Sequence, residues 1–235
     1  MAQNLHPALV VTVITACIVL CSGCSGTPAE AAPLNVAAIN SIKGYHARVQ
    51  ETIHVRNTTV NMQLTEDVIP PERARAQITA KSDGQTVIAN SITIGTRVWV
   101  KTGSEWREQS IDPSFRQTAV NAAMQICTAF KGLPARAETL QGQHAVHYTT
   151  KGASTDGLSD GFNQLFAAFS ALGLGNADIH MQVLSADLWT TADGAQPLRL
   201  KLKVAATANG EHRSVDALAD YSDIDGSDIE IEPPV

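Results

Sequence analysis

Three residues raise the question of hydrolysis. Gly157-Leu158-Ser159-Asp160-Gly161 matches the G-x-S-x-G motif, and Asp187 and His212 follow in the order that α/β-hydrolases use. In those enzymes the serine lies on a strained turn directly after a buried strand, because that turn exposes its hydroxyl group. Here the motif follows Lys-Gly-Ala-Ser-Thr-Asp, which is typical of a loop, and no alternation of parallel strands and helices surrounds it. We therefore expect Ser159 to cap a helix, and we assign no catalytic residue and no enzymatic activity.

Two other groups could hold a metal ion. His144 and His147 are three residues apart on an expected strand, which sends them to opposite faces of a sheet. Residues 223–228 (DIDGSD) resemble a calcium loop, but the glycine is at the fourth position, where an EF-hand needs it at the sixth, and the glutamate at position twelve is missing. A solvated strand end explains this segment better. We expect neither a metal site nor a cofactor.

The cysteines point to a different chemistry, the acylation of a thiol. Residues 8–21 form an uncharged apolar run that is shorter than the ~20 residues of a spanning helix and fits the core of a signal peptide. Cys24 follows Ser22 and Gly23, the small residues that a lipoprotein signal requires before its lipidated cysteine. Cys21 follows Val19 and Leu20 and does not fit.

Two features of this signal are atypical. Cys21 stands three positions before Cys24, where leucine or valine is usual, and the segment before the apolar run has no lysine or arginine. An ordinary secretory signal followed by a linker is the alternative. We expect a signal peptide over 1–23, a lipidated Cys24 with a tether over 24–33, and a single domain over 34–235. Only Cys127 then remains as a thiol, on the apolar face of an expected helix, where a buried and inert thiol is favoured.

Most of the remaining chain alternates between apolar and polar residues with period two. The clearest cases are 47–56, 59–64 and 198–204, with further runs at 74–80, 86–94, 97–101 and 144–150. Such alternation between short turns predicts antiparallel strands with one apolar and one solvated face. The segment 228–232 (DIEIE) continues the pattern, so we expect a last strand with Ile229 and Ile231 facing inward.

Three segments have helical periodicity instead. They are 34–43, a longer helix that begins at Asp112-Pro113 and ends before Gly132 and Pro134, and 158–172, which holds three of the five phenylalanines between glycine-rich flanks. Strands in sequence with helices gathered on one face predict an α+β fold.

The charge distribution limits the classes of partner. The formal net charge is −6, and residues 216–235 carry seven acidic groups and no lysine or arginine. Nucleic-acid binding depends on basic contacts to phosphate, so we exclude it. Attraction to anionic lipids needs basic residues as well, so membrane attachment would come from the acyl chains at Cys24.

In the order of its elements along the sequence, the chain resembles the LolA-like cell-envelope lipoproteins, most closely the LppX/LprG type. The resemblance covers nearly the whole mature chain and rests on the first short helix, on 71–78 (PERARAQI), 91–106 (SITIGTRVWVKTGSEW), 187–202 (DLWTTADGAQPLRLKL) and 221–234 (YSDIDGSDIEIEPP). It implies an incomplete antiparallel β-barrel, a curved sheet with helices plugging its concave side. It also implies a hydrophobic cavity between sheet and helices, in which members of the type carry acylated molecules.

We therefore expect a lipid-anchored protein on the outer side of the cell membrane that carries an acyl-chain lipid or lipoglycan. A membrane transporter or acceptor protein would be a further partner. Because alternation alone does not separate a cavity from a filled interior, a module of the same fold that senses or scaffolds a membrane partner through its acidic tail remains the alternative. The expected ligand-contacting residues are Val49, Ile53, Val60, Met62, Leu64, Ile78, Met124, Ile126, Phe162, Phe166, Phe169, Leu200 and Leu202.

Overall fold

The computed structural model describes residues 32–70, 72–111, 113–171, 179–208, 210–226 and 228–234. Within this part, eleven strands form a single sheet in the order β6-β5-β4-β3-β2-β1-β11-β10-β9-β8-β7. The strands are β1 (Tyr45–Val55), β2 (Thr58–Ile69), β3 (Arg73–Ser82), β4 (Gln85–Ile94), β5 (Arg97–Lys101), β6 (Trp106–Ser110), β7 (Ala135–Leu140), β8 (Gln143–Thr149), β9 (Ile179–Thr191), β10 (Pro197–Ala208) and β11 (Glu211–Ser222).

All neighbouring strands are antiparallel, and the sheet is curved and does not close. The first and last long strands of the chain pair at its centre, with Val49 of β1 opposite Ala219 of β11. This pairing brings the beginning and the end of the sheet-forming chain together, and the fold is the expected α+β half-barrel.

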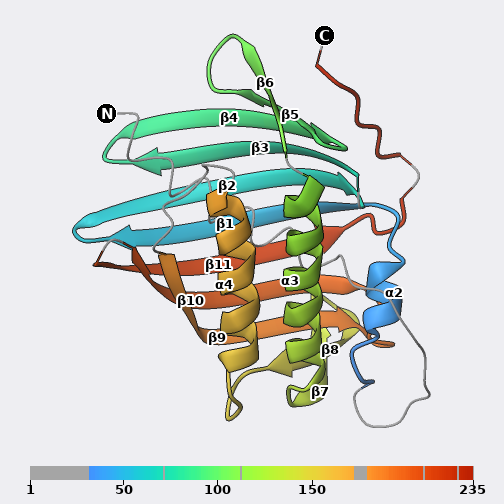
Figure 1. Ribbon diagram of the computed structural model, residues 1–235. Helices are drawn as coiled ribbons and strands as arrows, with labels where there is room; N and C mark the ends of the chain where they lie inside the picture. The colour runs from blue at the N-terminus through green and yellow to red at the C-terminus, as the bar shows by residue number, and fades with distance from the viewer. Residues whose placement is uncertain are drawn as a thin grey trace.

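In the described part of the chain, three helices accompany the sheet: α2 (Val36–Asn40), α3 (Pro113–Lys131) and α4 (Asp156–Ala171). The long helices α3 and α4 lie side by side across one face of the sheet, with α4 against β9 (Figure 1). We call this face the inner face and the opposite one the outer face. The short α2 precedes β1, and its first turn is capped by Asn35, whose Oδ1 accepts a hydrogen bond from Ala38 N at 3.1 Å. No helix in the described ranges has the length and apolarity needed to cross a bilayer.

The predicted elements are largely present. The strand expected over 144–150 is β8, and the helix expected from Asp112-Pro113 is α3. The helix expected over 158–172 is α4, which begins slightly earlier, at Asp156.

The strand predicted over 228–232 was wrong. This segment has no strand structure, and Ile231 is fully buried against Ile92 and Trp99 on the outer face of the sheet. Trp99 lies opposite Ile92 in the β4–β5 pair, and Ile229 packs at the edge of the same cluster. The C-terminal segment therefore covers a second, smaller apolar cluster outside the barrel.

Candidate functional site

The inner face of the sheet is a largely apolar surface. Alternate residues of β1 and β2 point to it, and the register places Val49 opposite Leu64 and Ile53 opposite Val60. The expected contact residues of the sheet all belong to this face. They are Val49, Ile53, Met62, Leu64, Ile78, Leu200 and Leu202, which are buried in the main core cluster, and Val60, which is half-buried beside it.

The two long helices contribute the opposite side of the same cluster. Ile126 of α3 and Phe162 and Phe166 of α4 are buried there with the strand residues. Phe169 is within α4, but its side chain lies outside the described part of the structure. The placement expected for Met124 was wrong. It lies about 200° around α3 from Ile126 and is 43% exposed.

Alanines distinguish one part of the inner face. Ala74, Ala76 and Ala80 take three of the inner positions of β3, and Ala89 lies opposite Ile78 on β4. The corresponding positions of β2 carry larger side chains, since Met62 pairs with Ala80 and Val68 with Ala74. A wall of methyl groups leaves more room above it than a wall of branched side chains. The inner side chains of this part of the sheet are therefore shorter than those of β2.

Two carboxyl groups interrupt the apolar surface. Glu66 of β2 is 8% exposed and lies between Ala47 of β1 and Ala76 of β3, and burial, aided by the neighbouring charge of Asp67, raises its pKa to about 8. Its carboxyl is therefore mostly neutral at pH 7 and can donate a hydrogen bond. Glu51 of β1 is a second buried glutamate on this face. The sequence pattern missed both residues, although Glu66 continues the series Val60, Met62, Leu64.

Polar side chains of α4 form hydrogen bonds with the part of β9 that does not pair with β8. Strand β8 pairs with β9 only from Asp187 to Thr191, so the earlier residues of β9 lack a strand partner on that side. Val183 N donates to Ser159 Oγ at 3.0 Å. Asn163 accepts from Met181 N and donates to Met181 O, both at 2.8 Å. Ser159 therefore bridges helix and sheet from within the first turn of α4, and the predicted cap role was wrong.

The histidines and the cysteine singled out in the sequence lie apart from the inner face or have a structural role. His144 is exposed and His147 is buried on the outer face, where its ring stacks on Trp189 with centroids 4.2 Å apart and its Nε2 lies 2.8 Å from Asp187 Oδ1. Cys127 is a buried thiol in α3. The described residues contain no cluster of three or more metal-ligating side chains. Cys24 lies outside the described residues.

The acidic C-terminal region makes contacts within the chain. Asp216 lies 3.3 Å from Lys203 Nζ, and Asp220 accepts from Arg199 Nε at 2.6 Å. Asp225 Oδ1 accepts from Lys43 N at 2.6 Å. Asp223 Oδ2 also lies 3.9 Å from His46 Nε2. At least four of the seven acidic groups therefore have contacts within the chain, which gives little support to a tail reserved for a partner protein.

Comparison with known proteins gives structural relatives only. No family model matches the sequence, and no curated protein matches it either. Among solved structures, the chain is similar to the lipoprotein LppX of Mycobacterium tuberculosis (16% identity, 83% of this chain and 92% of that one, TM-score 0.47). It is also similar to LprF of Mycobacterium bovis (14% identity, 83% of this chain and 90% of that one, TM-score 0.38). A third similar structure is a LolA superfamily protein of Nitrosomonas europaea (11% identity, 80% of this chain and 88% of that one, TM-score 0.30).

These similarities concern the fold. One of these structures is described as a LolA superfamily protein, and each alignment covers at least four fifths of the present chain. What the present chain binds has to be argued from its own residues.

Proposed function

We propose that this protein is a lipid-anchored, non-enzymatic carrier that holds the acyl chains of a lipid or lipoglycan between the inner face of the sheet and the helices α3 and α4. The observation that carries the proposal is the inner face itself. It presents a largely apolar surface from β4 to β9, and in its β3–β4 part the alanines Ala74, Ala76, Ala80 and Ala89 surround Ile78.

The energetics of such a site are favourable. Each methylene group removed from water contributes about 0.8 kcal/mol, so ten methylenes contribute about 8 kcal/mol before the cost of lost freedom is subtracted. Micromolar affinity corresponds to about −8 kcal/mol, so a longer acyl chain or a second chain would supply the surplus that remains after this cost. The ligand therefore needs few polar contacts to be held.

The buried carboxyl of Glu66 adds a preference for the polar end of the ligand. A neutral carboxyl group donates a hydrogen bond to an ester carbonyl or a hydroxyl oxygen, whereas a fatty-acid carboxylate beside it would add a second buried acid to the site. The proposed cargo is accordingly an uncharged ester or alcohol of one or more acyl chains, such as a glycolipid, rather than a free fatty acid.

The amino-terminal segment would determine where in the cell the protein is held. An acylated Cys24 would hold the domain at the outer surface of the cell membrane, in the periplasm or cell envelope, with residues 24–33 as its tether. A carrier in this position would pass its cargo between the membrane and a transporter or acceptor protein.

Native mass spectrometry of protein purified without detergent tests the proposal. We expect a mass increment of one acylated molecule per chain, and extraction with organic solvent should release an ester or alcohol lipid. A chain free of lipid that also takes up none from vesicles of uncharged and anionic lipids would contradict the proposal.

A further inference from the structure

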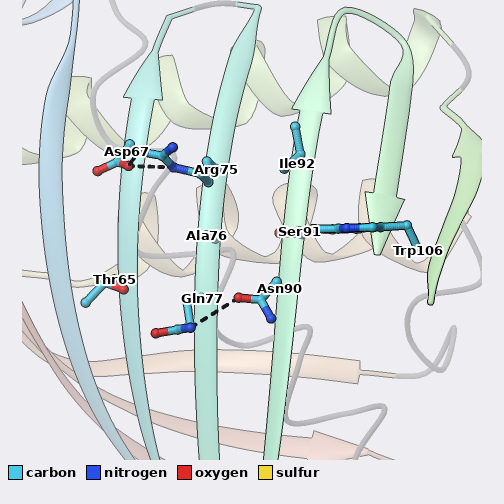
Figure 2. Close-up of a pocket in the computed structure, with 9 residues that line it drawn as sticks. All are labelled: Thr65, Asp67, Arg75, Ala76, Gln77, Asn90, Ser91, Ile92 and Trp106. Carbon is cyan, nitrogen blue, oxygen red and sulfur yellow. Dashed lines mark hydrogen bonds and ion pairs between the residues drawn. The ribbon is translucent and has the colours of Figure 1, made fainter. Parts of the chain in front are cut away.

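A pocket lies on the outer face of the sheet, opposite the proposed acyl site. It has a volume of about 280 Å³ and opens to solvent. Strands β2, β3, β4 and β6 line it (Figure 2) with Thr65, Asp67, Arg75, Ala76, Gln77, Asn90, Ser91, Ile92 and Trp106. Its volume is near the lower end of the range for small-molecule sites, so a ligand of one or two rings fits it best.

The charged side chains of the pocket neutralise each other. Arg75 Nε donates to Asp67 Oδ2 at 2.9 Å, and Asp67 also contacts His46 at the side of the pocket. The pocket lining contains no other charged side chain. The lining itself therefore offers a charged ligand no unbalanced opposite charge, and the nearby Lys101 ammonium group lies against the Trp106 ring. The pocket therefore favours a neutral ligand.

Two amide side chains supply polar groups of both kinds. Gln77 Nε2 donates to Asn90 Oδ1 at 3.2 Å, which fixes the two side chains side by side on β3 and β4. That bond uses the nitrogen of Gln77 and the oxygen of Asn90. The oxygen of Gln77 and the nitrogen of Asn90 are left to accept from and donate to a ligand. Such adjacent donors and acceptors match the hydroxyl groups on neighbouring ring carbons, each of which both donates and accepts.

An aromatic ring forms the apolar side of the pocket. The Trp106 side chain reaches from β6 toward Ser91 of β4 (Figure 2). It is half-buried, packs on the cluster of Ile92, Trp99 and Ile231, and has Lys101 Nζ 5.8 Å from its ring centroid. These contacts hold the ring in place before any ligand arrives. An indole face packs well against the C–H groups on one side of a sugar ring.

From these features we propose that the outer pocket binds a neutral saccharide of one or two rings. The ring stacks on Trp106 and Ile92, and its hydroxyl groups hydrogen-bond with Gln77, Asn90 and the Asp67–Arg75 pair. The site lies on the sheet face opposite the proposed acyl site. Its occupant is therefore a separate molecule, such as the end of an envelope glycan, and the inference does not depend on lipid carriage.

NMR of the tryptophan indole N–H groups tests this proposal on the purified protein. The chain has three tryptophans, so three indole signals are expected, and Trp189 on β9 serves as an internal reference. The probes are maltose, trehalose, mannobiose and chitobiose, with glucuronic acid as a charged comparison. We expect at least one neutral disaccharide to shift the Trp106 signal in a saturable way and to leave the Trp189 signal unchanged.

Variants locate the binding. Gln77→Ala should raise the dissociation constant read from the Trp106 signal about tenfold or more. Trp106→Ala lacks that signal, so its binding is measured by isothermal titration calorimetry beside the wild type, and it should weaken by a similar factor. Gln77 is exposed, so its replacement does not threaten folding. Ile88→Ala changes an exposed residue on the same face of β4 outside the pocket and should bind like the wild type. The proposal is overturned if no neutral saccharide shifts the Trp106 signal, if glucuronic acid binds better, or if Gln77→Ala leaves the dissociation constant unchanged.

Discussion

Gly161 of α4 lies directly against Ile126 of α3. A Cβ atom placed on Gly161 would be 2.6 Å from Ile126 Cγ1 and 3.2 Å from Ile126 N, closer than two carbon atoms or a carbon and a nitrogen normally approach. The absence of a side chain at this one position lets the two helices pack at close range above the sheet. The helices α3 and α4, which face the inner face of the sheet, are thus in close backbone contact as well as packed through apolar side chains.

Replacing Gly161 by alanine is expected to destabilise the protein. Alanine favours a helix over glycine by about 1 kcal/mol, but the methyl group would force α3 and α4 apart, which typically costs 1–3 kcal/mol in a packed core, about as much or more. We expect Gly161→Ala to lower the urea midpoint. The comparison variant is Gly157→Ala on the same helix, where the new Cβ would be 3.3 Å from Ala129 Cβ. This contact is less close than the one at Gly161, so Gly157→Ala should lower the urea midpoint less than Gly161→Ala. A stabilising Gly161→Ala would show that the helices separate without cost.

Asn163 is expected to contribute to stability through β9. Its side chain bonds both the N–H and the C=O of Met181, which is buried, so Asn163→Ala would leave two buried polar groups without this partner. We expect a loss of about 2 kcal/mol or more in the free energy of unfolding, and faster hydrogen exchange at the Met181 amide. Gln164→Ala removes an exposed amide from the next position and should change neither quantity. Equal effects of the two variants would rule out the proposed attachment of α4 to β9.

Glu66 is expected to make stability fall as the pH rises. Its pKa is raised to about 8 in the folded protein from an ordinary value of 4.5. Between these values the folded chain keeps a proton that the unfolded chain has lost. The contribution of Glu66 is therefore complete below pH 4.5, and it falls by roughly 1.4 kcal/mol per pH unit up to about pH 8.

Glu66→Gln has nearly the same shape and no proton to lose, so it should remove this term. Urea unfolding of wild type and variant from pH 5 to pH 9 measures the difference, in which the titration of all other groups cancels. We expect the free energy of unfolding of Glu66→Gln minus that of the wild type to increase with pH up to about pH 8 and to stay constant above it. A difference that does not change with pH would mean that Glu66 is ionised in the folded protein.

Cys24 is predicted to hold the protein at the membrane. Cys24→Ser removes the thiol that receives the diacylglyceryl group, so the protein should move from the membrane fraction to the soluble fraction and lose the mass of its acyl chains. Cys21→Ser should change neither. A wild type already in the soluble fraction would favour the alternative, an ordinary secretory signal followed by a linker. If Cys24→Ser stays in the membrane fraction, acylation of Cys24 is not what holds the protein there.

The alternation of apolar residues predicted most of the sheet, because a strand with one buried face needs period two wherever it lies. The same signal failed for Ile229 and Ile231. It shows that one side of a segment is apolar, but not which apolar surface that side covers, and here Ile92 and Trp99 offered a second one outside the barrel. On α3, Met124 looked like part of the buried stripe because methionine is apolar, and only the packing of α3 shows which arc of the helix is buried.

The polar members of the site were less accessible to sequence reasoning. Glutamate on an inner position ends an apolar series, so Glu66 and Glu51 disappear from a pattern that counts apolar residues. The pairing of Ser159 and Asn163 with β9 depends on a missing strand partner, which no local sequence feature signals. The outer pocket joins residues from four strands, so it could be found only in three dimensions.

The central claim, that acyl chains lie over the alanine-lined inner wall, is tested most directly by titrating delipidated protein with a fluorescent fatty-acyl ester. Ala80→Phe places a large ring on the inner face, and Thr79→Phe places the same ring on the outer face of the same strand. We predict saturable uptake of the ester by the wild type and by Thr79→Phe, and at least tenfold weaker uptake by a folded Ala80→Phe whose stability is within about 1 kcal/mol of the wild type. No uptake by the wild type, together with strong destabilisation by Ala80→Phe, would mean that the protein fills its own interior and would contradict the account.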